Sequence, residues 1–134
     1  MNRGGKTCKS FLGFSFLLCL FVAGIDFVQG RYYFVGGRQG WDLYPELIKW
    51  PQGKHFKTGD VLVFNYNIEG GNLFSPVRVD KAGYETCDPS VLKMSDRFNG
   101  TGHDRMRLTK GYNCFISAVQ DYCGYGMKIA VYAW

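Results

Sequence analysis

The residues that could do chemistry stand near the end of the chain. Ser117, Tyr122 and Met127 are five residues apart, and Cys123 follows the middle one. A thioether and a thiolate are soft ligands of the kind that copper binds, so this spacing raises the question of a metal site. Neither Ser117 nor Tyr122 has a histidine or paired carboxylates near it in the sequence, as catalysis by these groups would require. No enzyme motif occurs elsewhere, so we predict that the protein is not an enzyme.

The other candidate ligands are scattered along the chain. His55 and His103 are its only histidines, and both stand in polar turn regions, which favours exposed loop side chains. Cys114 precedes Ser117 by three residues, and an odd offset along a strand places two side chains on opposite faces. We therefore expect Cys114 to be a small buried side chain and not a copper ligand. An intermolecular disulfide is the alternative.

The first 30 residues have the pattern of a removable secretory signal peptide. Three basic residues precede an apolar stretch from Phe11 to Ala23, and Gly30 provides a small residue at the cleavage point. The apolar stretch is too short to anchor the chain in a bilayer about 30 Å thick. We predict a signal peptide at 1–30 and one mature domain at 31–134, with a retained signal anchor as the alternative.

The composition of the mature region excludes some classes of partner. It has 13 basic and 10 acidic side chains, a net charge of +3, with no basic run typical of nucleic-acid binding. This charge suits an acidic polysaccharide but is also ordinary for a soluble protein. No spacer and apolar tail follow the last strand pattern, so we expect no membrane anchor. Asn99, followed by Gly100 and Thr101, fits the N-glycosylation acceptor pattern of exported proteins.

The cysteines indicate one disulfide. Cys8 and Cys19 would leave with the signal peptide, so Cys87, Cys114 and Cys123 would enter an oxidising compartment. Three is an odd number, which predicts one bridge and one free thiol. The spacings alone leave open which two residues pair.

Short strand patterns dominate the mature region. They lie at 31–35, 60–66, 77–79, 106–108, 115–119 and 127–132. About seven short strands in a domain of this length predict a β-sandwich. One short helix is expected after Asp88, with Pro89 in its first position. Five aromatic residues are expected in the core: Trp41, Trp50, Phe64, Tyr66 and Phe115.

Four stretches of the sequence together resemble the phytocyanins of plants. They read YFVGGRQGWDL, WPQGKHFKTGDVLVFNYN, VDKAGYETC and GMKIAVYA, and the resemblance covers 31–133. The plantacyanin, or basic blue protein, branch is the most similar. The resemblance implies an all-β, cupredoxin-like Greek-key β-sandwich of two sheets with one short helix. It also implies a disulfide between Cys87 and Cys123, which leaves Cys114 free.

The resemblance also locates the family's copper ligands. Members that bind copper use two histidines, a cysteine thiolate and a weak axial methionine. These positions fall on Gly71, Ser117, Tyr122 and Met127, so Met127 alone is retained. We therefore expect no competent type 1 copper site and no cofactor. The alternative is a copper-binding electron-transfer protein of the plantacyanin type.

The exchanged residues suggest another use for this end of the domain. Gly71 removes bulk, whereas Tyr122 adds a ring with a polar tip, and Phe74 and Tyr125 stand in neighbouring loops. Tyrosine offers contact area at little cost in rotamer entropy. We expect a secreted binding or signalling module of the apoplast, with Tyr122, Tyr125 and Phe74 contacting a wall glycan, a small ligand or an extracellular protein. The alternative is that Tyr122 merely fills the space.

Overall fold

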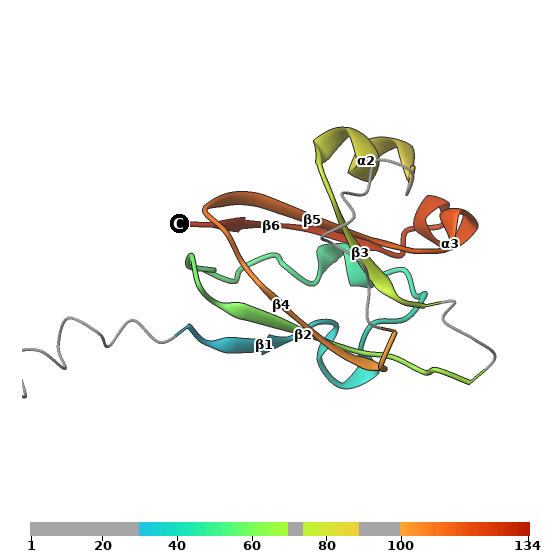
Figure 1. Ribbon diagram of the computed structural model, residues 1–134, viewed down its shortest axis with the longest axis horizontal. Helices are drawn as coiled ribbons and strands as arrows, with labels where there is room; N and C mark the ends of the chain where they lie inside the picture. The colour runs from blue at the N-terminus through green and yellow to red at the C-terminus, as the bar shows by residue number, and fades with distance from the viewer. Residues whose placement is uncertain (1–29, 70–73, 89–99) are drawn as a thin grey trace, which may run out of the picture.

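The computed structural model describes residues 30–69, 74–88 and 100–134, and these form a sandwich of two three-stranded sheets (Figure 1). Residues 1–29 of the signal peptide predicted at 1–30, together with Gly71 and the stretch 89–99 with Asn99, lie outside the described residues. The first sheet has the order β1 (Tyr32–Phe34), β2 (Val61–Asn65), β4 (His103–Arg107). The second has the order β3 (Pro76–Val79), β5 (Gly111–Ser117), β6 (Lys128–Ala133). The two-sheet sandwich predicted from the sequence is confirmed.

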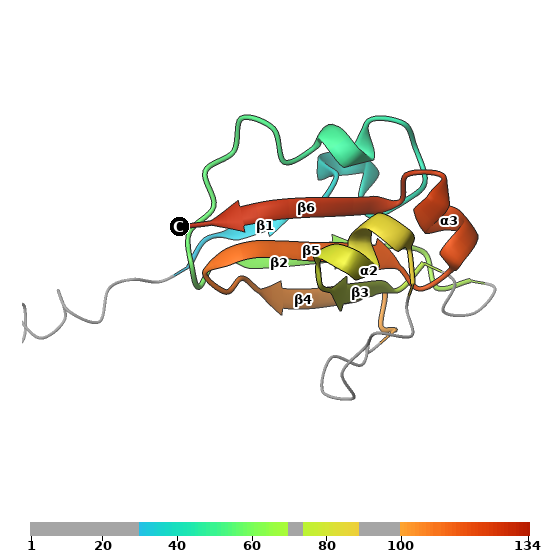
Figure 2. The same ribbon diagram turned by 90° about the horizontal axis from the view of Figure 1, so that it is seen from above.

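The pairing of the strands determines how the chain crosses the molecule. β1 and β2 are parallel, whereas β2 with β4, β3 with β5 and β5 with β6 are antiparallel. A parallel pair needs a long connection. Here it carries two 3-10 turns, η1 (Gly37–Gln39) and η2 (Leu47–Lys49), and η2 packs against β6 (Figure 2).

Alternation of side chains along the strands builds the core. Leu62 and Phe64 of β2 are fully buried and face Phe115 of β5, whose ring centroid lies 5.1 Å from that of Phe64. Trp41 is also buried, while Trp50 and Tyr66 are partly buried against the same cluster. The predicted aromatic core is therefore confirmed.

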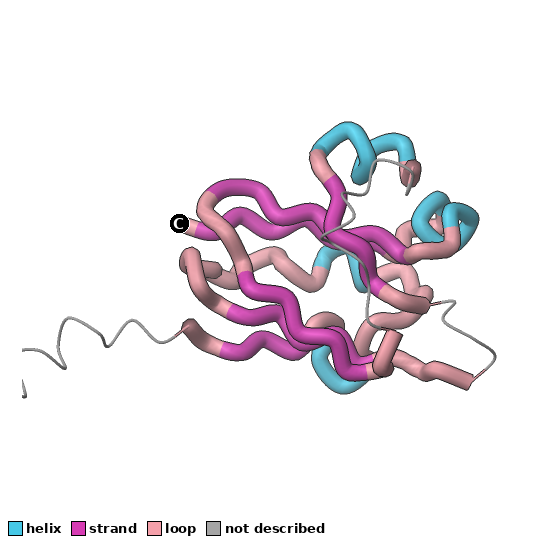
Figure 3. Tube along the Cα trace, in the orientation of Figure 1, coloured by secondary structure: helices cyan, strands magenta, loops and turns pink. Residues whose placement is uncertain are grey.

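Two short helices were not predicted from the sequence, whereas the helix expected after Asp88 lies outside the described residues and stays a prediction. The described residues contain α2 (Lys81–Thr86) and α3 (Gln120–Gly124), of which α2 covers the outer face of the second sheet (Figure 3). The side chain of Asp80 caps α2 by accepting a hydrogen bond of 2.8 Å from Gly83 N. Segments of six and five residues are too short to show a helical period, which is why the pattern missed them.

Two strands also extend beyond their predicted bounds. β5 begins at Gly111 instead of Phe115 because it pairs with β6 as far as Ala133. β4 begins at His103, opposite Asn65, so the prediction that His103 lies in a turn is wrong. These limits depend on a distant partner strand, which a local pattern does not contain.

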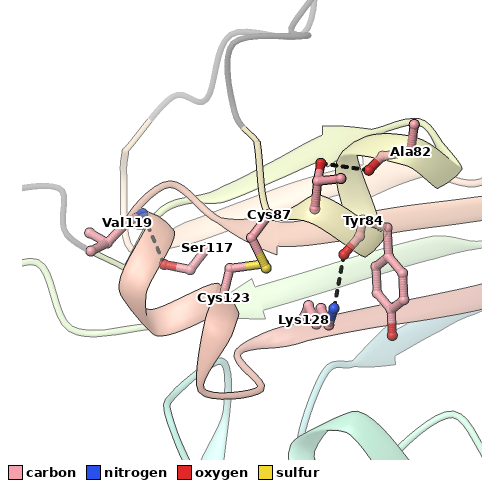
Figure 4. Close-up of a disulfide and its surroundings, with 8 residues drawn as sticks. Ala82, Tyr84, Cys87, Ser117, Val119, Cys123 and Lys128 are labelled. Atoms are coloured by element: carbon pink, nitrogen blue, oxygen red, sulfur yellow. Dashed lines mark hydrogen bonds between the residues drawn. A yellow bond between two sulfur atoms is a disulfide. The ribbon is translucent and has the colours of Figure 1, made fainter.

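A disulfide joins Cys87, at the end of α2, to Cys123 in α3 (Figure 4). The pairing implied by the resemblance is confirmed, and Cys114 is free and buried. No helix among the residues that the structure describes is both long and apolar enough to cross a membrane.

Replacing Cys87 and Cys123 together by Ala should lower the free energy of unfolding by about 4 kcal/mol, because the bridge closes a loop with a sequence separation of 36. Urea unfolding of the oxidised proteins measures this loss. The control Cys114→Ala removes a buried thiol outside the bridge and should cost about 1 kcal/mol. Equal losses in the two variants would contradict the prediction.

Candidate functional site

Three of the four positions implied as copper ligands are held together by main-chain hydrogen bonds. Ser117 N donates to Met127 O at 3.0 Å, and Met127 N donates to Tyr122 O at 2.9 Å. The chain leaves β5, makes the single turn of α3 and returns to β6, so that these three residues converge at one end of the second sheet (Figure 1). The main chain therefore brings together the three residues that stand five apart in the sequence.

The resemblance implies the thiolate position of copper-binding members for Ser117, whose hydroxyl is used within the chain. The side chain is fully buried, and Oγ accepts a hydrogen bond of 3.2 Å from Val119 N, as Figure 4 shows. This bond helps the chain to turn from β5 into α3. A hydroxyl is a harder donor than a thiolate, so Ser117 does not fit the ligand set of a type 1 copper site.

Tyr122, for which the resemblance implies a histidine position, packs against another aromatic ring. Its ring stacks on that of Phe74 with centroids 5.5 Å apart and planes 10° apart. Phe74 is fixed in turn by Trp41, whose Nε1–H donates to Phe74 O at 2.5 Å. Both rings are half-buried against the main core, in which Met127 is fully buried. The aromatic pair thus closes this end of the core.

A polar hollow of about 450 Å³ lies beside Phe74. Its lining consists of residues 37–42 and 65–67 together with Phe74 and His103. Gly40 has φ +71°, and a Cβ there would come within 2.6 Å of Asn65 O, so only glycine lets the loop approach the end of β2 so closely.

His103 is a residue of this hollow that sequence reasoning missed. Both histidines are exposed, as predicted, but His103 Nδ1 lies 2.8 Å from Asn65 Oδ1 and lines the hollow. Arg38 and Asn67 line it as well. No local signal marks these residues, because they come from three segments that meet only in the fold.

A buried carboxylate supports the wall of the hollow. Asp104 is 4% exposed, and it accepts hydrogen bonds of 2.6 Å from the Tyr66 hydroxyl and from Thr101 Oγ1. Burial raises the pKa of Tyr66 above its ordinary value, and the hydrogen bond to Asp104 raises this pKa further. Tyr66 therefore holds its proton toward Asp104.

The remaining predicted residues lie elsewhere. Tyr125 is 76% exposed and lines a different hollow with Cys87 and Gln120, so its contact with a ligand together with Phe74 and Tyr122 stays a prediction. Cys114 is free and buried in the second core cluster, whereas its neighbour Phe115 belongs to the first, which confirms that Cys114 is a small buried side chain. Burial raises the pKa of the Cys114 thiol, and Asp80 and Glu85 raise it further.

Within 30–69, 74–88 and 100–134, no three His, Cys, Asp or Glu side chains gather as a group that could hold a metal ion. The donors at the implied ligand positions are a hydroxyl, a phenol and a thioether. This set lacks the thiolate and the imidazoles that fit type 1 copper.

The chain is similar to several known proteins. A family model described as "Plastocyanin-like domain" matches residues 41–127, which include all four implied ligand positions. The basic blue protein of Arabidopsis thaliana is 42% identical over 109 residues, covering 81% of this chain and 78% of that protein. Chemocyanin of Lilium longiflorum is 35% identical over 133 residues, covering 99% of each. The solved structure of cucumber basic protein, a blue copper protein, has a TM-score of 0.65 at 37% identity, covering 77% of this chain and 99% of that one.

The contact between Tyr66 and Asp104 predicts the titration of Tyr66. A raised pKa favours the neutral phenol, so stability contributed by Tyr66 is fully present below pH about 10 and is lost as the pH rises through the folded-state pKa. Asp104→Asn removes the charged acceptor and should lower the pKa of Tyr66. Ultraviolet titration of the phenolates, with Tyr66→Phe to assign its contribution, measures this shift. A curve for Asp104→Asn that superimposes on the wild type would contradict the prediction.

Proposed function

The chain belongs to the phytocyanin family, and on that premise we propose that it is a secreted, single-domain member that has lost the type 1 copper centre. It acts outside the cell as a binding or signalling module and catalyses no reaction. The mature domain spans 31–134 after removal of the signal peptide at 1–30, and Asn99 carries a glycan.

The exchange of donor atoms at Ser117 and Tyr122 is the observation that supports this proposal most. The Ser117 hydroxyl takes part in the turn into α3, and the Tyr122 ring stacks on Phe74. A blue copper site needs a thiolate for its intense absorption and imidazoles to hold the ion. Cys114 does not supply the thiolate, because it lies in the other core cluster.

The hollow beside Phe74 is the proposed contact site for a ligand. It combines one aromatic ring with the guanidinium of Arg38, the amide of Asn67 and the imidazole of His103. Sugars bind to proteins through this combination, since their C–H faces pack on aromatic rings while their hydroxyl groups exchange hydrogen bonds. A wall glycan is therefore the proposed ligand. Tyr122 supports Phe74 from behind and is not among the lining residues.

Titration of the mature domain with Cu(II) should give no intense blue absorption band, because the soft thiolate and both imidazoles are absent. The matched control is the triple variant Gly71→His, Ser117→Cys and Tyr122→His, which restores the ligand set on the retained spacing and should produce the band. A blue band from the wild type at one copper per chain would instead establish the electron-transfer alternative.

Binding of the mature domain to an array of plant wall glycans tests the proposed ligand. Phe74→Ala and Arg38→Ala should each weaken binding roughly tenfold, the equivalent of about 1.4 kcal/mol. Tyr125→Ala is the matched control, because Tyr125 is exposed outside the hollow. Equal binding by all four proteins, or no binding by the wild type, would refute the glycan site.

A further inference from the structure

A buried carboxylate holds the start of β1, at the end of the sandwich opposite α3 (Figure 1). Arg31 N donates to Asp60 Oδ1 at 2.8 Å, and Lys57 N donates to Asp60 Oδ2 at 2.8 Å. Asp60 is only 4% exposed. Both carboxylate oxygens thus accept from main-chain nitrogens, one of which belongs to the first residue of the proposed mature domain.

The sheet itself fixes the position of Arg31 N. Val61 N donates to Arg31 O at 2.8 Å, and Tyr32 is the strand partner of Val61. Leu108 N donates to Asp60 O at 2.7 Å. Since these contacts lie within the first sheet and its flanking residues, Arg31 N stays beside Asp60 whether or not a peptide precedes it.

Gly30 passes unusually close to the neighbouring turn. A Cβ built on Gly30 would lie 1.9 Å from Gly59 O and 2.8 Å from Asp60 N. Any side chain there would collide with backbone atoms, so a chain that continues upstream of Arg31 passes this point only with glycine. Cleavage of a signal peptide also requires a small residue immediately before the cut. Packing and processing therefore place the same requirement on Gly30.

We propose that the ammonium group created when the proposed signal peptide is cut off at the Gly30–Arg31 bond pairs with the Asp60 carboxylate. A peptidase of the secretory membrane hydrolyses the bond: water adds across the C–N bond, Gly30 leaves as a carboxylate, and the nitrogen of Arg31 takes up protons to become an ammonium. A neutral amide donor is thereby replaced by a cation at the same place. The processing step rests on the secretion proposed above.

The new pair adds an attraction between opposite charges to the bond that it replaces. The amide of Arg31 already donates to an ionised acceptor, and cleavage makes the donor ionised as well. The cationic side chains of the surrounding segments are Arg31, Lys57, Arg105 and Arg107, of which Arg107 donates to Gly59 O at 3.3 Å. All four are exposed, so water and salt screen their repulsion of the ammonium. The buried carboxylate at hydrogen-bond distance is screened less, so its attraction prevails.

Pairing makes the stability of the processed domain depend on pH. A free α-amino group has a pKa of about 8, and the adjacent carboxylate favours its charged form, so its pKa in the folded protein is higher. The stabilisation is therefore fully present below pH about 8 and is lost as the pH rises through the folded-state pKa.

Expression of the full chain in a secreting plant cell line tests the processing site. Mass spectrometry of the exported protein should find Arg31 as its first residue. A different first residue, or retention of the leader, would overturn the assignment. Neither result affects the copper and glycan experiments, so failure here is distinguishable from failure of the proposed function.

A comparison of two recombinant domains tests the ion pair without any need for secretion. Cucumber basic protein shows that a domain of this length folds alone. The match covers 99% of that chain and 77% of this one. One domain begins at Arg31, and the matched control begins at Gly30, which moves the ammonium away by one residue. The unfolding equilibrium constant of the Arg31 domain should be roughly tenfold lower at pH 6.5, which corresponds to one unit of pKa. The difference should vanish at pH 10.5. Equal unfolding constants at both pH values would refute the pair.

Asp60→Asn in both domains should abolish the difference at every pH. If these variants do not fold, chemical labelling of the wild-type domains decides the question. The rate at which the α-amino group is acetylated, followed against pH, gives its pKa, which should be higher in the Arg31 domain than in the Gly30 domain. Identical profiles would refute the pair.

Discussion

The geometry of the site depends on the main-chain hydrogen bonds that close the segment between β5 and β6. Ser117 N bonds to Met127 O, and Met127 N bonds to Tyr122 O. These bonds use atoms that every one of these residues possesses, so they do not depend on which side chain occupies each position. The disulfide of Cys123 with Cys87 adds a covalent constraint beside them. The backbone of this segment is therefore held in the same way whichever side chains stand at the positions implied as copper ligands.

Two buried carboxylates accept hydrogen bonds at the two ends of the first sheet. Asp104 accepts from the Tyr66 hydroxyl beside the hollow, and Asp60 accepts from Arg31 N at the opposite end. A buried charge is costly unless hydrogen bonds replace the lost water, and each of these carboxylates has donors on both of its oxygens. The same requirement thus shapes the wall of the proposed binding site and the attachment of the amino-terminal strand.

The sequence predicted the sandwich because its strands carry a strong alternation, as at Leu62 and Phe64, and because four quoted stretches resembled one family. It predicted the strand limits less well, since β5 extends back to Gly111 through its pairing with β6. It missed α2 and α3, which are single short segments that rely on the Asp80 cap and on the disulfide. Such elements are stabilised by contacts and not by a period of their own.

The sequence by itself determined which donor atoms stand at the implied ligand positions and that an odd number of cysteines, three, lies within 31–134. Those properties belong to residue types and need no coordinates. Only the tertiary structure decided that Tyr122 stacks on Phe74, that Phe74 and Tyr125 line different hollows, and that His103 lines the hollow beside Phe74. It alone brought Arg31 N to Asp60, 29 residues away. Contacts between segments so far apart arise from the pairing of strands, which no local pattern specifies.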